Sequence, residues 1–193
     1  MVNQLEINIL CDSENSGVIS FTDIVSGNIS LDSGNYTAEG FWGLTGGFQV
    51  TIEGYKTVFN TTDFHYLIKA TNFLIHSLFW INGKTSDRFD KDDFFPDDVV
   101  VRTTGGNLIR LQNHSNLELL FSYTPQRENY IFKRGDRFFE GLPINKQTWF
   151  SQCNIALGEF FDILLSVANE DKTNETSKLM MGYYRFWQDV SSG

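Results

Sequence analysis

The sequence has few of the residue types that most often perform chemistry or staple a small fold. It contains two cysteines, three histidines and three prolines among 193 residues. Cys11 and Cys153 lie far apart and lack Cys-x-x-Cys spacing, so neither a zinc knuckle nor a redox pair is indicated. We therefore expect two reduced thiols in the protein core.

Motifs for covalent catalysis and for phosphate binding are also missing. There is no Gly-x-Ser-x-Gly nucleophile elbow, and the pattern around Cys153 places this thiol on the apolar face of a helix, where burial raises the pKa. The glycines of residues 43–47 lack the Lys-Ser/Thr ending of a P-loop. No histidine has a His, Cys or acidic neighbour at ligand spacing: His65, His76 and His114. We expect no enzyme, no metal site and no cofactor.

Basic residues are scarce relative to acidic ones. The chain has 24 Asp and Glu against 15 Lys and Arg, which gives a formal charge of -9. Nucleic-acid binding needs clustered Lys and Arg, and anionic membranes repel such a protein, so both partners are disfavoured. The same charge would attract a basic protein partner. The simplest alternative is that the charge only keeps the protein in solution.

Long apolar runs are absent too, because nowhere do eighteen uninterrupted apolar residues occur. Residues 1–10 lack the basic start and apolar stretch of a secretion signal, so we expect a cytoplasmic protein. What the chain does have is an aromatic content of 15%. With 41% hydrophobic residues, this composition predicts one folded domain over residues 1–193.

Periodicity predicts strands in the N-terminal part and in the middle of the chain. Residues alternate between apolar and polar at 5–11 and 48–52, and a short apolar run occupies 18–21 within an otherwise loop-like region, 12–40. Four further strands separated by turn residues are typical of an antiparallel meander: 99–103, 108–112, 117–123 and 129–133.

Helical spacing of apolar residues predicts two long helices and a short one. The long helices cover about 62–81 and the region from about 146 to 168, and the short one covers 179–190. A possible polar linker, 169–177, precedes the last helix. The expected fold is α+β, a mainly antiparallel sheet with the two long helices packed on one face and a short C-terminal helix.

The segment 87–98 is the main candidate for a partner-binding site. It combines carboxylates, which can pair with Arg or Lys, with phenylalanines that can fill pockets on a partner. A calcium or magnesium site is the weaker interpretation, because the glycine and the closing glutamate of a calcium loop are absent. A solvated connector pinned to the core is the other alternative. The candidate binding residues are Asp87, Asp90, Asp92, Asp93, Phe94, Phe95, Asp97 and Asp98.

Two other segments are open to more than one interpretation. The basic cluster of Lys133, Arg134 and Arg137 could balance the acidic segment or form a dimer contact. The aromatic-rich segment 182–190 has interface-type residues, but docking of the last helix on the core is the favoured explanation.

One stretch resembles a known family. Residues 140–150 (EGLPINKQTWF), followed by 156–164 (ALGEFFDIL), look like the strand, helix entry and helix near the ends of several bacterial immunity proteins. The resemblance covers about one fifth of the chain, and no motif residue can be carried over. It implies a small, acidic, cytoplasmic α+β protein that neutralises a polymorphic or contact-dependent toxin.

Composition and resemblance together favour a non-enzymatic acidic protein that inhibits a basic toxin, for example a nuclease, by direct binding. A phage or mobile-element protein that blocks a host nuclease or defence complex would use the same physics. A small-ligand binder or an enzyme with an unrecognised site is the third possibility, with Trp42, Tyr55 and Trp80 as candidate cavity residues.

Overall fold

The fold is taken from a computed structural model of the chain. The structure describes residues 4–57, 64–83, 94–95, 98–102, 106–124, 139–168 and 173–191. All structural statements below concern these residues.

A four-stranded antiparallel sheet forms the N-terminal part, in the order β2-β1-β3-β4. The strands are β1 (Leu5–Ser13), β2 (Gly17–Ser20), β3 (Gly46–Ile52) and β4 (Tyr55–Lys56). In β1 the alternate residues are buried, as the sequence predicts for a strand with one covered face. The long β1–β3 pairing runs from Leu5 opposite Ile52 to Cys11 opposite Gly46.

A second antiparallel sheet has five strands in sequence order, β5 (Phe94–Phe95), β6 (Asp98–Arg102), β7 (Leu108–Asn113), β8 (Glu118–Thr124) and β9 (Phe139–Asn145). The predicted meander is thereby confirmed for 99–103, 108–112 and 117–123. The strand predicted at 129–133 lies outside the described residues. Strand β9 occupies an edge of this sheet and contains Pro143, which has no N–H to offer to a further strand.

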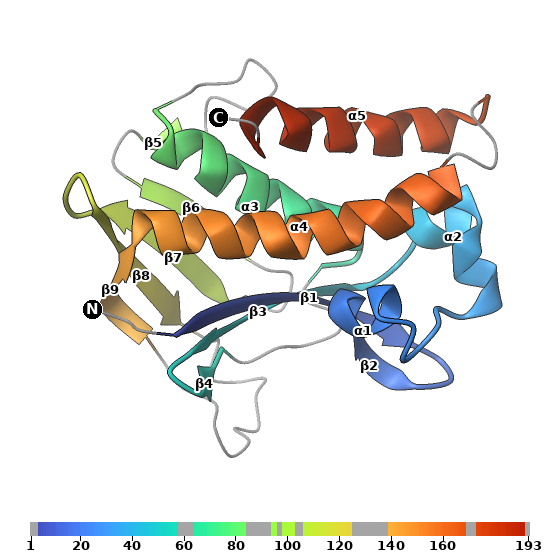
Figure 1. Ribbon diagram of the computed structural model, residues 1–193, viewed down its shortest axis with the longest axis horizontal. Helices are drawn as coiled ribbons and strands as arrows, with labels where there is room; N and C mark the ends of the chain where they lie inside the picture. Colours follow the sequence, from blue (N-terminus) through green and yellow to red (C-terminus); the bar gives the residue numbers. More distant parts are fainter. Residues whose placement is uncertain are drawn as a thin grey trace.

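The long helices α3 (Leu67–Ile81) and α4 (Lys146–Ala168) lie on the same side of the strands, and α5 (Glu175–Ser191) lies on top of them (Figure 1). Helix α4 contacts β1 of one sheet and β9 of the other, and α3 contacts β3 and β6. The α+β class and the antiparallel strands are therefore as predicted.

Several details of the prediction are wrong. The strands form two sheets instead of one, and residues 12–40 contain two short helices, α1 (Phe21–Val25) and α2 (Ala38–Trp42), with a 3₁₀ turn at Ser33–Tyr36. Serine and threonine side chains cap both helices: Ser20 accepts from the Asp23 amide and Thr37 from the Gly40 amide. Ser and Thr favour loops as well as helix N-caps, so the sequence alone predicts loops where these two short helices form.

Two helix boundaries also differ from the prediction. Helix α3 begins at Leu67 and not near 62, because Phe64 is extended and exchanges backbone hydrogen bonds with Gly46. Helix α5 is longer than the short helix expected, and residues 175–177 of the suggested linker belong to it. The side chain of Asn174 starts this helix by accepting from the amides of Thr176 and Ser177.

The core is one connected cluster of buried apolar residues that extends over both sheets and all long helices. Aromatic pairs join its parts: Phe48 of β3 stacks on Phe73 of α3 at 5.5 Å, and Phe121 of β8 packs on Trp149 of α4 at 5.8 Å. Both cysteines are free and buried, which confirms the prediction of core thiols. Within the described ranges no helix is long and apolar enough to cross a membrane.

Candidate functional site

The predicted binding segment is only partly described. Asp87, Asp90, Asp92, Asp93 and Asp97 lie outside the described residues. Phe94 and Phe95 form strand β5, which pairs with the start of β6 so that Phe94 faces Val99 and Phe95 faces Asp98 across the ladder. The pairing places Phe94 and Phe95 in an edge strand of the five-stranded sheet and Asp98 in the strand next to it. Their role in partner binding stays a prediction, and the basic cluster at 133–137 also lies outside the description.

A second acidic region, which the whole-chain charge conceals, occupies the N-terminal part. The first 55 residues contain no Lys, Arg or His. They contain seven carboxylates, namely Glu6, Asp12, Glu14, Asp23, Asp32, Glu39 and Glu53. Counting charge in windows along the chain would have revealed this asymmetry.

Neutral donors hold one carboxylate of this region, Asp32, in place. Asp32 accepts hydrogen bonds from the Asn15 side chain, from the Glu14 amide at 2.9 Å and from the Ser13 hydroxyl at 3.2 Å. These hydrogen bonds, that from Asn15 above all, lower the pKa of the Asp32 carboxyl. Asp32 therefore keeps its negative charge while it fixes the loop between β1 and β2.

Two further carboxylates, Glu6 and Glu159, accept hydrogen bonds from neutral side chains that lie close together. The Asn8 amide donates to Glu6 at 2.8 Å, and the Thr22 hydroxyl lies 3.4 Å from the Asn8 carbonyl and 2.8 Å from a Glu159 oxygen. Since Thr22 has one hydroxyl proton, the shorter contact identifies Glu159 as its acceptor. Strand β1, helix α1 and helix α4 thus meet at side chains that carry negative charge and no positive charge.

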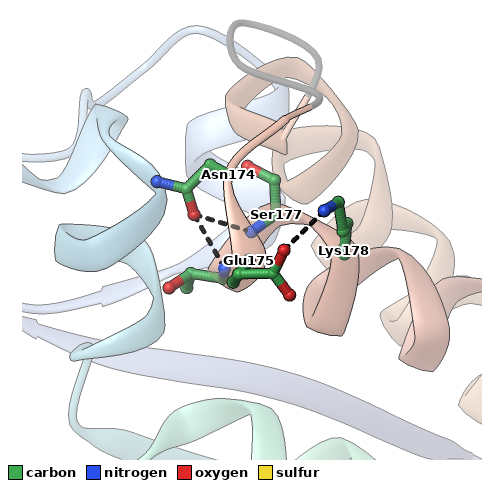
Figure 2. Close-up of polar contacts among 5 residues, drawn as sticks. Asn174, Glu175, Ser177 and Lys178 are labelled. Atoms are coloured by element: carbon green, nitrogen blue, oxygen red, sulfur yellow. Dashed lines mark hydrogen bonds and ion pairs between the residues drawn. The ribbon is translucent and has the colours of Figure 1, made fainter.

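Charge is compensated differently at the start of α5. Here Lys178 forms an ion pair with Glu175, one turn away on the same helix (Figure 2). Asn174 caps the helix and donates to Glu39 of α2 at 2.6 Å. Among the described residues no cationic partner is found for Glu6, Asp23, Asp32 or Glu159.

Both thiols are buried and His76 is partly buried, and this burial shifts their pKa values. Burial raises the pKa of Cys11 to about 12, and the neighbouring Asp12 and Asp32 add to the effect. Burial also raises the pKa of Cys153, whose sulfur lies 4.0 Å from the Ser77 hydroxyl oxygen. In the same way, burial lowers the pKa of His76 to about 3, so this side chain is neutral at physiological pH.

Two open hollows are lined by described residues. One, of about 270 Å³, lies where the end of α3, the β7–β8 turn and the start of α4 meet. The other, of about 550 Å³, lies over β7, β8 and β9 and includes Arg110, Gln112, Ser122 and Glu140. Neither includes Trp42, Tyr55 or Trp80. A cavity lined by those three aromatics stays a prediction.

The C-terminal aromatic segment docks on the core, as favoured from the sequence. Trp187 stacks on Phe161 of α4 at 5.1 Å, and its indole N–H donates to Asn154 at 2.9 Å. Phe186 stacks in the same way on Phe79 of α3 at 4.8 Å. These aromatics attach α5 and are not free for a partner.

The part of the chain that the structure covers has no group of three His, Cys, Asp or Glu residues able to hold a metal ion. The comparisons give no relative: no family model, no curated protein and no solved structure matches this chain.

Proposed function

We propose that this protein is a non-enzymatic acidic binding protein that inhibits a basic protein partner by direct contact. The immunity-type role implied by the sequence resemblance fits this activity, with a basic toxin such as a nuclease as the partner. We further propose that it acts in the cytoplasm, which agrees with two free, buried thiols.

The observation that carries the proposal is a set of ordered carboxylates that have no cationic partner among the described residues. Neutral donors hold Glu6, Asp23, Asp32 and Glu159 in place, so their charge is fixed in position and not cancelled. Fixed, uncancelled charge gives a strong field at the surface and loses little side-chain entropy when a cation binds. A basic partner would therefore associate faster, and it would bind more tightly when the ionic strength is lower.

The first test is capture of partners from the source cells, or of the neighbouring gene product, on the immobilised protein at low and high salt. We expect one basic protein at stoichiometric amounts, retained at low salt and weakened at high salt. Recovery of the bait alone at both salt concentrations would contradict the proposal.

Matched triple variants make the test specific to charge position. The test variant carries Asp12→Asn, Glu14→Gln and Glu53→Gln in the cation-free region. The control carries Glu118→Gln, Glu140→Gln and Asp189→Asn, which changes the net charge equally. The first should weaken binding of the captured protein more than the second.

The predicted segment 87–98 is tested separately. Reversal of charge at Asp90, Asp92 and Asp93 should weaken partner binding if this segment forms part of the contact surface. Unchanged affinity would show that this assignment is wrong while leaving the binding function itself intact.

A second candidate function, binding of a small ligand, is favoured by the hollow over β7–β9. Its volume of about 550 Å³ lies within the range of ligand pockets, and it combines apolar with polar side chains. A ligand that binds there would raise the thermal unfolding temperature, and Gln112→Ala should reduce this shift.

A further inference from the structure

The exposed faces of α1 and α4 meet and form a mixed acidic and apolar surface. The two helices are joined by the hydrogen bond between Thr22 and Glu159. One turn from each of these residues lies an exposed apolar side chain, Val25 on α1 at 45% exposure and Ile155 on α4 at 52%. We call Thr22, Val25, Ile155, Glu159 and Asp162 the α1–α4 surface.

Helical geometry explains why these side chains share one side. Positions 155, 159 and 162 follow the i, i+4, i+7 pattern, so they form one stripe along α4. The opposite face of this helix is buried, including Phe160 and Phe161. Figure 1 shows α1 beside the C-terminal half of α4, with α5 on the other side of that helix.

The base of the surface is rigid. Phe21 of α1 packs against Phe160 of α4 at 4.9 Å, and Phe41 of α2 packs against the same ring at 5.4 Å. The exposed residues therefore stand on elements that are fixed by the core, and binding there requires little ordering of the backbone.

The charge of the α1–α4 surface indicates which class of partner can bind there. Glu159 and Asp162 carry the only charges on α4 after Lys146, and the neighbouring α1 contributes Asp23 and no cation. Phosphate groups of a nucleic acid or an anionic membrane would be repelled. A second copy of the chain would place like charges opposite each other across a two-fold interface. A cationic protein segment that also carries an aliphatic side chain matches both features.

We propose that the α1–α4 surface is the docking site for such a segment, with Ile155 in apolar contact and Glu159 and Asp162 paired with Arg or Lys of the partner. This inference rests on the proposed function and adds the surface and the chemistry of the contact. It is separate from Phe94, Phe95 and Asp98, the described part of the segment 87–98, which belong to the five-stranded sheet.

The test uses two short peptides of equal positive charge, one alternating Arg with Leu and the other alternating Arg with Ser. Amide shifts of the full chain are recorded by NMR during each titration at low salt. We expect the largest shifts at residues 22–25 and 155–162, and tighter binding of the leucine peptide.

Single variants separate apolar contact from charge. Ile155→Ser should abolish the preference for the leucine peptide, whereas Leu179→Ser, at a 57% exposed position on α5, should keep it. Asp162→Lys should lower the affinity for both peptides about three- to tenfold. The matched Asp189→Lys on α5 should lower it less. Circular dichroism confirms that each variant is folded.

Two outcomes overturn the inference in distinguishable ways. Saturable binding with shifts elsewhere, or equal effects of the test and control variants, rules out this surface and leaves the proposed function standing. Absence of saturable binding by either peptide at low salt removes the cationic partner and with it the proposed function.

Discussion

Two buried serines show how individual polar groups affect this fold. Ser77 donates to the Leu74 carbonyl at 2.7 Å, and its oxygen accepts the indole N–H of Trp149 at 2.9 Å. Ser177, at 1% exposure, has a buried hydroxyl without any hydrogen-bond partner. A satisfied hydroxyl stabilises the core slightly, and an unsatisfied one costs about 1 to 3 kcal/mol.

Replacement of Ser177 by Ala should therefore stabilise the protein by about 1 kcal/mol, because the unpaired hydroxyl is removed and alanine favours helix. Ser77→Ala should destabilise it by about 1 to 3 kcal/mol, because Trp149 loses its acceptor. Urea unfolding measures both. A loss of stability in Ser177→Ala would show that this hydroxyl has a partner in solution.

The lowered pKa of His76 predicts how the stability of the protein depends on pH. Its folded pKa of about 3 lies below the ordinary 6.5, so the unfolded chain binds more protons between these values. Stability should therefore fall as the pH drops below about 6.5. Between pH 7 and pH 5 the free energy of unfolding of the native protein should fall by roughly 2 kcal/mol more than that of the His76→Gln variant. The two stability curves should run parallel above pH 7, and a constant difference across the whole range would contradict the prediction.

At the scale of the elements, periodicity and capping predict most of the long segments. The alternation at 5–11 and 48–52 and the helical spacing at 146–168 each match an observed element. The division into two sheets could not be predicted, because strand order depends on long-range pairing and not on local pattern. The start of α3 was missed because the Phe64–Gly46 bridge is a tertiary contact.

The candidate site was harder to predict than the fold. The segment 87–98 attracts attention because its carboxylates are adjacent in sequence. Asn8 donates to Glu6 and Thr22 donates to Glu159, and the Asn8 and Thr22 side chains come within 3.4 Å of each other only after folding. Glu6 and Glu159 are separated by most of the chain. Spacing alone cannot indicate such a group.

Two glycines illustrate how an element restricts its residues. A Cβ at Gly46, in β3, would lie 2.1 Å from the Leu10 carbonyl oxygen, whereas a Cβ at Gly182, in α5, would meet no atom within 4 Å. Gly46→Ala should therefore destabilise the protein by more than about 2 kcal/mol, because two paired strands must separate. Gly182→Ala should stabilise it by about 1 kcal/mol through helix propensity. Chemical denaturation of both variants provides the comparison, and a neutral Gly46→Ala would contradict the close β1–β3 approach.

At the scale of the whole molecule, the net charge of -9 opposes compaction. Screening by salt reduces this repulsion, since the Debye length falls to about 3 Å at 1 M.

The thermal unfolding temperature should thus rise with sodium chloride. The rise should be smaller in the triple variant Asp12→Asn, Glu14→Gln, Glu53→Gln than in the native protein, because fewer like charges remain close together. Scanning calorimetry at several salt concentrations measures the effect. An unfolding temperature that is independent of salt would show that the carboxylates do not repel each other appreciably.

The position of α4 across both sheets has a consequence for synthesis of the protein. Phe21 and Phe41 are translated early, but the ring of Phe160 that they contact is not made until about four fifths of the chain has been translated. Until then β1 lacks the cover that α4 provides, although α3 can already pack against β3. A nascent chain stalled before residue 146 should therefore expose the uncovered face of β1 to chaperones, and release of the completed chain should end their binding.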